Sequence, residues 1–286
     1  MSRLMCGGLT TIDLAYLQDE LPVRGGKGTT DRSYIDVGGP VANAAITAAI
    51  LGSEVHVHSV LGSGLFADRA RQTLATYSIN VFEHGYGVEL PVASIWIDAT
   101  GERTILSTDN QRSQVEANPA LISMEGVTAV LLDGHYPQLQ RALAEAAADA
   151  GVPIVLDCGR WRPIFAELLP LATDAIMTAT FRPPALEGLS NAETIAQIKV
   201  QYGVTVCAVS RGPESILVAE SGGIREVPVP AVAVIDTTGA GDVLHGAYLH
   251  YRYGEGLSAD ESLRHAAVVA SKSCTALGAR LVADSG

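Results

Sequence analysis

Short β-branched runs alternate with alanine-rich helical runs along most of this chain of 286 residues. Residues 55–61 and 127–133 have the pattern of strands, and helical patterns follow them at 66–77 and 138–150. Two more strands are predicted at residues 153–157 and 204–210. Because successive strand–helix units build a parallel sheet covered by helices on both faces, this alternation predicts an α/β fold.

Two stretches interrupt the alternation, at about residues 14–36 and 92–108. The first is polar and glycine-rich, and the second alternates apolar and polar residues around the turn Thr100-Gly101-Glu102. Such patterns indicate strands rather than helices. We expect these two insertions to form a small β-lid outside the main sheet. The chain length is close to the upper size of one hydrophobic core, so we expect a single domain over residues 1–286.

Composition excludes several classes of protein. Lys and Arg number 19 against 31 Asp and Glu, a net charge of −12, which argues against a general nucleic-acid binder. The longest apolar stretch, residues 41–51, is too short to cross a bilayer, and the N-terminus lacks the pattern of an export signal. The four cysteines are far apart and form no C-x-x-C pair. We therefore expect a cytoplasmic protein with no membrane partner.

The segment Asp236-Thr237-Thr238-Gly239-Ala240-Gly241-Asp242 carries the strongest chemical signal. It follows an apolar run at 229–235, which has the pattern of a strand, and it opens a predicted helix. Backbone N–H groups at a glycine-rich helix start form an anion site, and an acid in the first turn could accept a proton from a hydroxyl. The same residues would also suit a plain turn followed by an acid that favours the helix dipole.

A second cluster lies near the N-terminus. Gly38 and Gly39 precede Pro40, a residue suited to the first position of a helix, and Asn43 follows one turn later. Asp13 is predicted to end the first strand, at the kind of position where α/β proteins usually bind ligands. Taken singly, each residue also suits a structural role in a turn, a cap or a buried hydrogen bond.

Together, the Gly38-Gly39-x-x-x-Asn43 cluster and the Asp236–Asp242 segment resemble the motifs of the ribokinase family, the PfkB carbohydrate kinases. The resemblance covers nearly the whole chain. It implies a ribokinase-like three-layer sandwich with a mostly parallel central sheet and a small β-sheet lid. It also implies transfer of the γ-phosphoryl group of ATP to a hydroxyl of a sugar or sugar derivative, with Mg²⁺ as a cofactor.

The resemblance assigns a role to each matching position. Asp242 would be the general base, and Gly239, Ala240 and Gly241 would form the anion hole. Sugar hydroxyls would meet four residues: Asp13, Gly38, Gly39 and Asn43. Ser210 and Gly212 would lie near ATP. A monovalent cation such as K⁺, which many members bind, would meet Asp236, Thr238 and the loop that contains Ser273, Ala276 and Gly278.

The chain also departs from the family pattern. The Asn-x-x-Glu that helps to organise Mg²⁺ is missing from residues 178–184. Lys27, Arg103 and His135 are predicted to face the sugar cleft, where they would recognise a charged or bulky group. Gly26-Lys27 and Gly39-Pro40 resemble the branch that contains sulfofructose kinases, although His135 and Ser107 stand where those enzymes have Arg and Asn. Exposed lid edges also predict a homodimer through the lid.

Other hypotheses remain open at this point. Gly62-Ser63-Gly64, with Glu83 about 20 residues on, matches a dinucleotide-binding fingerprint and would suit an NAD-dependent oxidoreductase. A nucleoside kinase of the same family and a non-catalytic sugar or nucleotide sensor are further alternatives. His56 and His58 share a strand face that would suit two metal ligands or two structural histidines. Arg160 and Arg162 would meet phosphate or an acidic substrate, or else form a surface pair.

Overall fold

The computed structural model describes residues 2–20, 22–85, 89–108 and 115–280. Within these residues the main sheet has nine strands, in the order β13-β12-β11-β10-β9-β8-β1-β4-β5. Its strands are β1 (Arg3–Gly7), β4 (Glu54–Ser59), β5 (Asn80–Glu83), β8 (Val127–Leu132), β9 (Ile154–Cys158), β10 (Asp174–Thr178), β11 (Val206–Arg211), β12 (Glu214–Glu220) and β13 (Gly223–Val227). All neighbours pair in parallel except β11–β12 and β12–β13.

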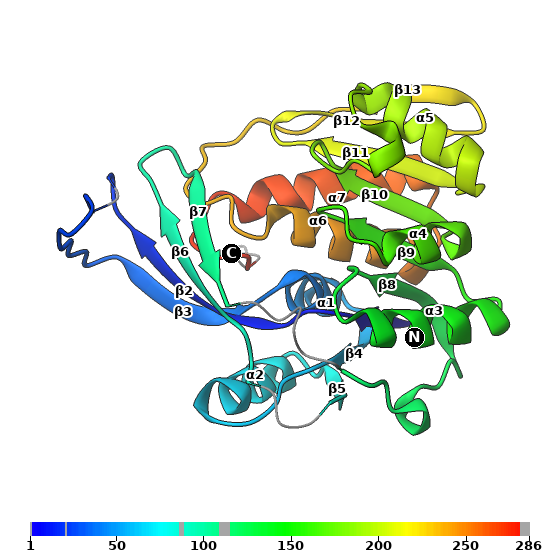
Figure 1. Cartoon of the computed structure of the whole chain (residues 1–286). Coiled ribbons are helices and arrows are strands. Elements are labelled where there is room, and N and C mark those ends of the chain that lie inside the picture. Colours follow the sequence, from blue (N-terminus) through cyan, green and yellow to red (C-terminus); the bar gives the residue numbers. More distant parts are fainter. Residues whose placement is uncertain (1, 21, 86–88, 109–114, 281–286) are drawn as a thin grey trace.

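Helices cover both faces of this sheet, as the alternation of strand and helix patterns predicts (Figure 1). One core lies under α1 (Pro40–Ile50), α2 (Leu65–Thr76), α6 (Ala240–Leu249) and α7 (Ala259–Ser273). The other lies under α3 (Pro137–Asp149), α4 (Phe165–Leu168) and α5 (Asn191–Tyr202). Strand β8 shows the division, because Ala129 and Leu131 join the first core while Val130 and Leu132 join the second. Short 3-10 turns at 119–121, 169–171 and 184–186 and a π-helical turn at 250–254 complete the helical segments.

The two insertions form the lid. Strands β2 (Thr11–Leu17), β3 (Ser33–Gly38), β6 (Val92–Ile97) and β7 (Arg103–Ser107) make a separate sheet in the order β3-β2-β6-β7. This sheet extends away from one end of the main sheet (Figure 1). The predicted β-lid and the α/β sandwich are both confirmed.

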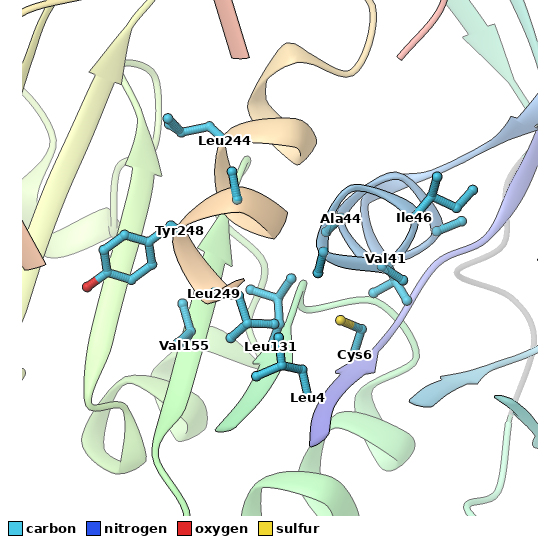
Figure 2. Close-up of a cluster of buried hydrophobic side chains, with 14 of the residues drawn as sticks. Leu4, Cys6, Val41, Ala44, Ile46, Leu131, Val155, Leu244, Tyr248 and Leu249 are labelled. Carbon is cyan, nitrogen blue, oxygen red and sulfur yellow. The ribbon is translucent and has the colours of Figure 1, made fainter. Parts of the chain in front are cut away.

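Helices α1 and α6 pack closely on the first core. Figure 2 shows Val41, Ala44 and Ile46 of α1 and Leu244 of α6 within one apolar cluster that also contains Leu4 of β1. At the helix crossing, a Cβ on Gly246 would lie 2.2 Å from the carbonyl oxygen of Ala44, so only glycine permits this approach. The contact brings the first turns of the two helices together.

One predicted strand is wrong. Residues 228–237 form no strand, although the run 229–235 is rich in β-branched residues. Pro228 and Pro230 lack the N–H groups that a ladder needs, and Val234 and Ile235 are almost half exposed, at 46% and 47%. Across the described ranges, no helix is both long and apolar enough to span a membrane.

Candidate active site

Most of the predicted site residues gather at one edge of the main sheet. The parallel strands β8, β9, β10 and β11 all end there, so the residues that follow each strand face a common space. His135 follows β8, and Asp157 lies near the end of β9. Thr178 ends β10 and pairs with Ser210 of β11. Pro40 is the first residue of α1. It lines the same pocket as His135 and Thr178, so the start of α1 lies beside this edge.

Asp242 lies in the first turn of α6, and its carboxylate is held by α1. The Asn43 amide donates from Nδ2 to Oδ2 of Asp242 at 2.8 Å. Burial, and then the negative charge of Asp157, raise the pKa of Asp242 to about 7, while the Asn43 hydrogen bond acts in the opposite direction. A carboxylate whose pKa is near neutrality can accept a proton and release it again at physiological pH.

Arg280 completes this hydrogen-bond network. Its Nη1 donates to Oδ1 of Asn43 at 2.8 Å, which fixes the amide so that Nδ2 faces Asp242. The same guanidinium pairs with Asp36 of the lid at 3.1 Å and donates to the carbonyl of Val37. The sequence prediction missed Arg280, since no motif surrounds it and only the fold brings it to Asn43, 237 residues away.

The start of α6 leaves open space beside backbone N–H groups. Gly239 is the N-cap residue, and its φ of 68° is a conformation that favours glycine. A Cβ at Gly239 would also lie 2.4 Å from Cβ of Ala279. By contrast, a Cβ at Gly241 would meet nothing within 4 Å, so open space lies beside the first-turn N–H groups. The N–H of Ala240 bonds to the carbonyl of Thr237 at 3.2 Å, whereas those of Gly241 and Asp242 have no partner of their own within the helix, and the helix dipole adds positive potential there.

Asp13 does not end the first strand, contrary to the prediction, because the chain turns after Gly7 and Asp13 lies within β2, on the inner face of the lid sheet, paired in register with Asp36. Its side chain is 8% exposed, and Oδ1 accepts a hydrogen bond from the Thr11 hydroxyl at 2.7 Å. Burial raises the pKa of Asp13 to about 6. Gly38, the register partner of Thr11, lies directly against this carboxylate. The predicted sugar-binding residues Asp13, Gly38 and Asn43 thus lie at the base of the lid, near Asp242.

The lid contacts the loop that precedes α6. Arg103 of β7 donates from Nη1 to Oγ1 of Thr237 at 2.9 Å and to its carbonyl at 3.2 Å. The Thr237 hydroxyl in turn donates to the carbonyl of Gly101 at 3.0 Å. Arg103 therefore bonds to this loop, whereas Lys27 is exposed in the connection between β2 and β3.

The residues predicted to hold a monovalent cation meet around Asp236. Its Oδ1 accepts from the backbone N–H of Thr238 at 2.8 Å. Its Oδ2 accepts from the N–H of Gly278 at 2.8 Å and from the hydroxyl of Tyr34, a lid residue, at 3.1 Å. These three donors satisfy the buried Asp236 carboxylate in this arrangement.

Ser273, in the loop of the predicted cation site, also forms hydrogen bonds with its neighbours. Ser273 Oγ donates to the carbonyl of Ala270 at 2.8 Å, and the Ser273 carbonyl accepts from the N–H of Ala276 at 3.4 Å. N–H and O–H donors thus engage the Asp236 carboxylate, whereas the buried Thr238 hydroxyl has no hydrogen-bond partner within the described residues. In the described part of the chain, no group of three or more His, Cys, Asp or Glu side chains could hold a metal ion.

A pocket of about 320 Å³ lies where β8, β9 and β10 end. It is lined by Pro40, Asp133, His135, Asp157, Gly159, Arg160, Arg162, Thr178 and Thr180. The volume lies within the usual range for small-molecule sites, roughly 300–1,000 Å³. His135, predicted to face the sugar cleft, lies here, and Ser210 and Gly212 lie at the end of β11, one strand beyond Thr178. The positions without Asn-x-x-Glu supply two threonine hydroxyls instead, from Thr178 and Thr180.

The residues that suggested a dinucleotide site and a histidine metal site contact other side chains instead. Glu83 forms two hydrogen bonds to Arg71, both at 2.7 Å, so its carboxylate is engaged rather than free for a ribose. Arg71 also donates to the carbonyl of Gly62, across the proposed dinucleotide loop. His58 is buried and bonds to His84 at 3.0 Å, whereas His56 contacts Glu54. These contacts favour structural roles for both groups.

Comparisons with known proteins agree with this geometry. The sequence profile described as pfkB family carbohydrate kinase matches residues 1–285. A ribokinase of Haemophilus influenzae is 26% identical over 268 residues, which cover 89% of this chain and 87% of that one. The crystal structure of a putative ribokinase from Agrobacterium tumefaciens has a TM-score of 0.84 at 23% identity, covering 97% of this chain and 92% of the other. Arabidopsis thaliana ribokinase complexed with ribose and ATP has a TM-score of 0.73 at 21% identity, with 97% and 94% covered. The chain described here therefore belongs to the PfkB family of carbohydrate kinases.

Proposed function

We propose that this protein transfers the γ-phosphoryl group of ATP to a hydroxyl of a small sugar or sugar derivative. One observation carries the proposal: the Asp242 carboxylate lies at the N-terminus of α6, held at 2.8 Å by Asn43 of α1. A proton acceptor and an anion-binding helix start therefore adjoin one another. Phosphoryl transfer needs this pair of functions, because the acceptor hydroxyl loses a proton while charge on the phosphoryl oxygens is stabilised.

In this mechanism Asp242 accepts the proton of the attacking hydroxyl. Its pKa of about 7 lets the ionised form accept the proton at neutral pH and release it after transfer. Asn43 and Arg280 keep the carboxylate oriented. Asp13, which is mostly buried at the base of the lid, accepts hydrogen bonds from other acceptor hydroxyls and so places the reacting one next to Asp242.

The start of α6 receives the phosphoryl oxygens. The open space at Gly241 and the N-cap at Gly239 leave room for a tetrahedral oxyanion against the first-turn N–H groups. When bound, ATP with Mg²⁺ supplies the electrophilic phosphorus and offsets the charge of the phosphate chain. Ser210 and Gly212, at the end of β11, contact the nucleotide in this proposal.

The lid excludes water from the reaction. Arg103 and Thr237 link the lid hairpin to the loop before Gly239 through bonds of 2.9 and 3.2 Å. A closed lid protects the phosphoryl group from hydrolysis. Because two of the similar proteins are named ribokinase, and one of them binds ribose and ATP, pentoses are the first acceptors to test. The likeness to the sulfofructose kinases remains a prediction.

The test is ADP release with Mg-ATP and K⁺ over a panel of pentoses, hexoses, sugar acids, sulfonated sugars and nucleosides. We expect release to depend on one acceptor class and to fall by about 10²–10⁴-fold in Asp242→Asn, the usual contribution of a general base. A nucleoside response would make the protein a nucleoside kinase. Binding of ATP without release on any acceptor would favour a sensor, and NAD binding without ATP binding would favour the oxidoreductase.

A further inference from the structure

The pocket at the ends of β8, β9 and β10 contains two arginine side chains that the proposed chemistry does not use. Arg162 and Arg160 follow β9, and both line the pocket together with His135. Arg160 is exposed, whereas Arg162 is partly buried against His135. A guanidinium in such a position needs a partner, because a partly desolvated charge without one is costly.

Neither hydrogen bond of Arg162 is to an acidic group. Its Nη2 donates to Nε2 of His135 at 2.6 Å, and Nη1 reaches the Arg160 carbonyl at only 3.5 Å. Within the described residues its buried Nε has no hydrogen-bond partner. Because arginine only donates, Nε2 of His135 must accept, and the ring proton then lies on Nδ1, which is 3.1 Å from Asp133.

Two carboxylates, Asp133 and Asp157, also line the pocket, and both attract the charge of Arg162 without forming a hydrogen bond to it. Asp133 accepts from the backbone N–H of Leu9 at 2.8 Å and of His135 at 2.9 Å. Burial alone would raise the pKa of Asp133, but His135 and these N–H donors lower it overall, so it stays ionised. Asp157 lies 3.5 Å from Nδ1 of His245, beneath α6. Because neither carboxylate forms a hydrogen bond to Arg162, the Nη N–H groups that His135 does not engage remain available to a ligand.

We propose that Arg162, supported by His135, forms an oxyanion subsite that binds an acidic group on the acceptor, so that the substrate is a sugar acid or a similarly charged sugar derivative. This inference rests on the proposed kinase function, because it takes the pocket to be the acceptor site. The planar guanidinium suits a carboxylate, sulfonate or phosphate group through two parallel hydrogen bonds.

The order of strands places the subsite on the acceptor side of the cleft. His135 and Arg162 follow β8 and β9, whereas Ser210 and Gly212, the proposed nucleotide contacts, follow β11. Strand β10 lies between β9 and β11 in the sheet. Pro40, which lines the same pocket, begins the helix that carries Asn43. A molecule bound against Arg162 therefore lies toward α1 and the lid rather than toward the β11 loop.

The experiment measures acceptor binding by calorimetry, without turnover, using matched pairs of an acid and its neutral counterpart. The pairs are D-ribonate and ribitol, D-gluconate and D-glucitol, and D-glucuronate and D-glucose. We expect at least one acid to bind about tenfold or more tightly than its neutral partner. In Arg162→Gln, that acid should lose about 30-fold or more in affinity, while its neutral partner changes little.

Two further variants control the interpretation. Arg141→Gln removes one positive charge on α3, from a guanidinium that pairs with Glu167, and should preserve the preference for the acid. Arg162→Lys keeps the charge but loses the planar fork, so it should recover only part of the affinity. Melting curves of each variant show whether the fold is retained.

Each outcome decides the proposal. Equal affinity for acids and neutral partners in the wild type would overturn it, as would an acid preference that survives Arg162→Gln. If Arg162→Gln weakens ATP binding instead and leaves the acid preference unchanged, the subsite holds a nucleotide phosphate and the acceptor assignment is wrong. If an Arg162-dependent acid preference is found but no acceptor yields Asp242-dependent ADP release, the subsite stands and the kinase proposal fails.

Discussion

The substitution Asn43→Ala tests how the fold sets the proton affinity of the proposed base. Asn43 supplies one hydrogen bond to Asp242, at 2.8 Å, and that bond favours the ionised carboxylate. A hydrogen bond to a charged group contributes about 1.5–3 kcal/mol, and the lower end applies because Asp242 is partly exposed. Since 1.36 kcal/mol corresponds to one pH unit, the midpoint of the acid limb should move to higher pH by about one unit.

The direction of the effect follows from the role of the base. Only ionised Asp242 accepts a proton, so kcat rises with pH through the pKa of about 7 in the wild type. In Asn43→Ala the ionised fraction at pH 7 falls from about one half to about one tenth, so kcat falls about fivefold. Near pH 9 the two enzymes should converge, because both carboxylates are then mostly ionised.

The assay is kcat against pH at saturating acceptor, which removes any direct contribution of Asn43 to acceptor affinity. Thr47→Val is the matched control, since Thr47 is buried in the same helix and donates to the carbonyl of Asn43 without touching Asp242. Its acid limb should coincide with that of the wild type. An Asn43→Ala profile with an unshifted acid limb would refute the argument that this hydrogen bond tunes the base.

Three further predictions concern stability, the anion site and assembly. Burial raises the pKa of Asp242 above its unfolded value, so the folded state favours the protonated carboxyl and the free energy of unfolding falls as pH rises through about 7. Asp242→Asn removes the cost of burying the ionised carboxylate, so it should raise Tm, and by more at pH 8 than at pH 5. Gly239→Ala should lower Tm, since its Cβ would meet Ala279, whereas Gly241→Ala should keep Tm but weaken ATP binding by filling open space. Leu106 is 76% exposed on the outer face of the lid, so Leu106→Glu should convert the predicted lid dimer into monomers in sedimentation; a wild type that sediments as a monomer would contradict that dimer.

Local patterns were sufficient to predict the architecture and the main motif. Strand–helix alternation predicted a parallel sheet, and the two interruptions predicted a lid that the structure builds as a separate sheet. Pro40 does begin a helix, and Gly239 does cap another. Each of these features depends on neighbours in the sequence, such as a fixed φ at proline or a positive φ at glycine, so the sequence alone can reveal it.

The contacts around the motif could not be predicted in the same way. Arg280 reaches Asn43, and Tyr34 reaches Asp236 from the lid, because the fold joins segments more than 200 residues apart. The sequence alone leaves open whether Arg162 contacts an acidic ligand or lies on the surface, because its partial burial against His135 depends on how β8 and β9 end. The run 229–235 has the side-chain pattern of a strand, but Pro230 within it and Pro228 before it lack the N–H groups that a strand ladder needs.

The most direct test of the central claim is a single-turnover measurement with radiolabelled γ-phosphate ATP, following label on the acceptor. Wild-type protein should transfer the label to the acceptor, and Asp242→Asn should slow that step by about 10²–10⁴-fold while its affinity for ATP stays unchanged. Transfer at the wild-type rate in Asp242→Asn would contradict the assignment of Asp242 as the base.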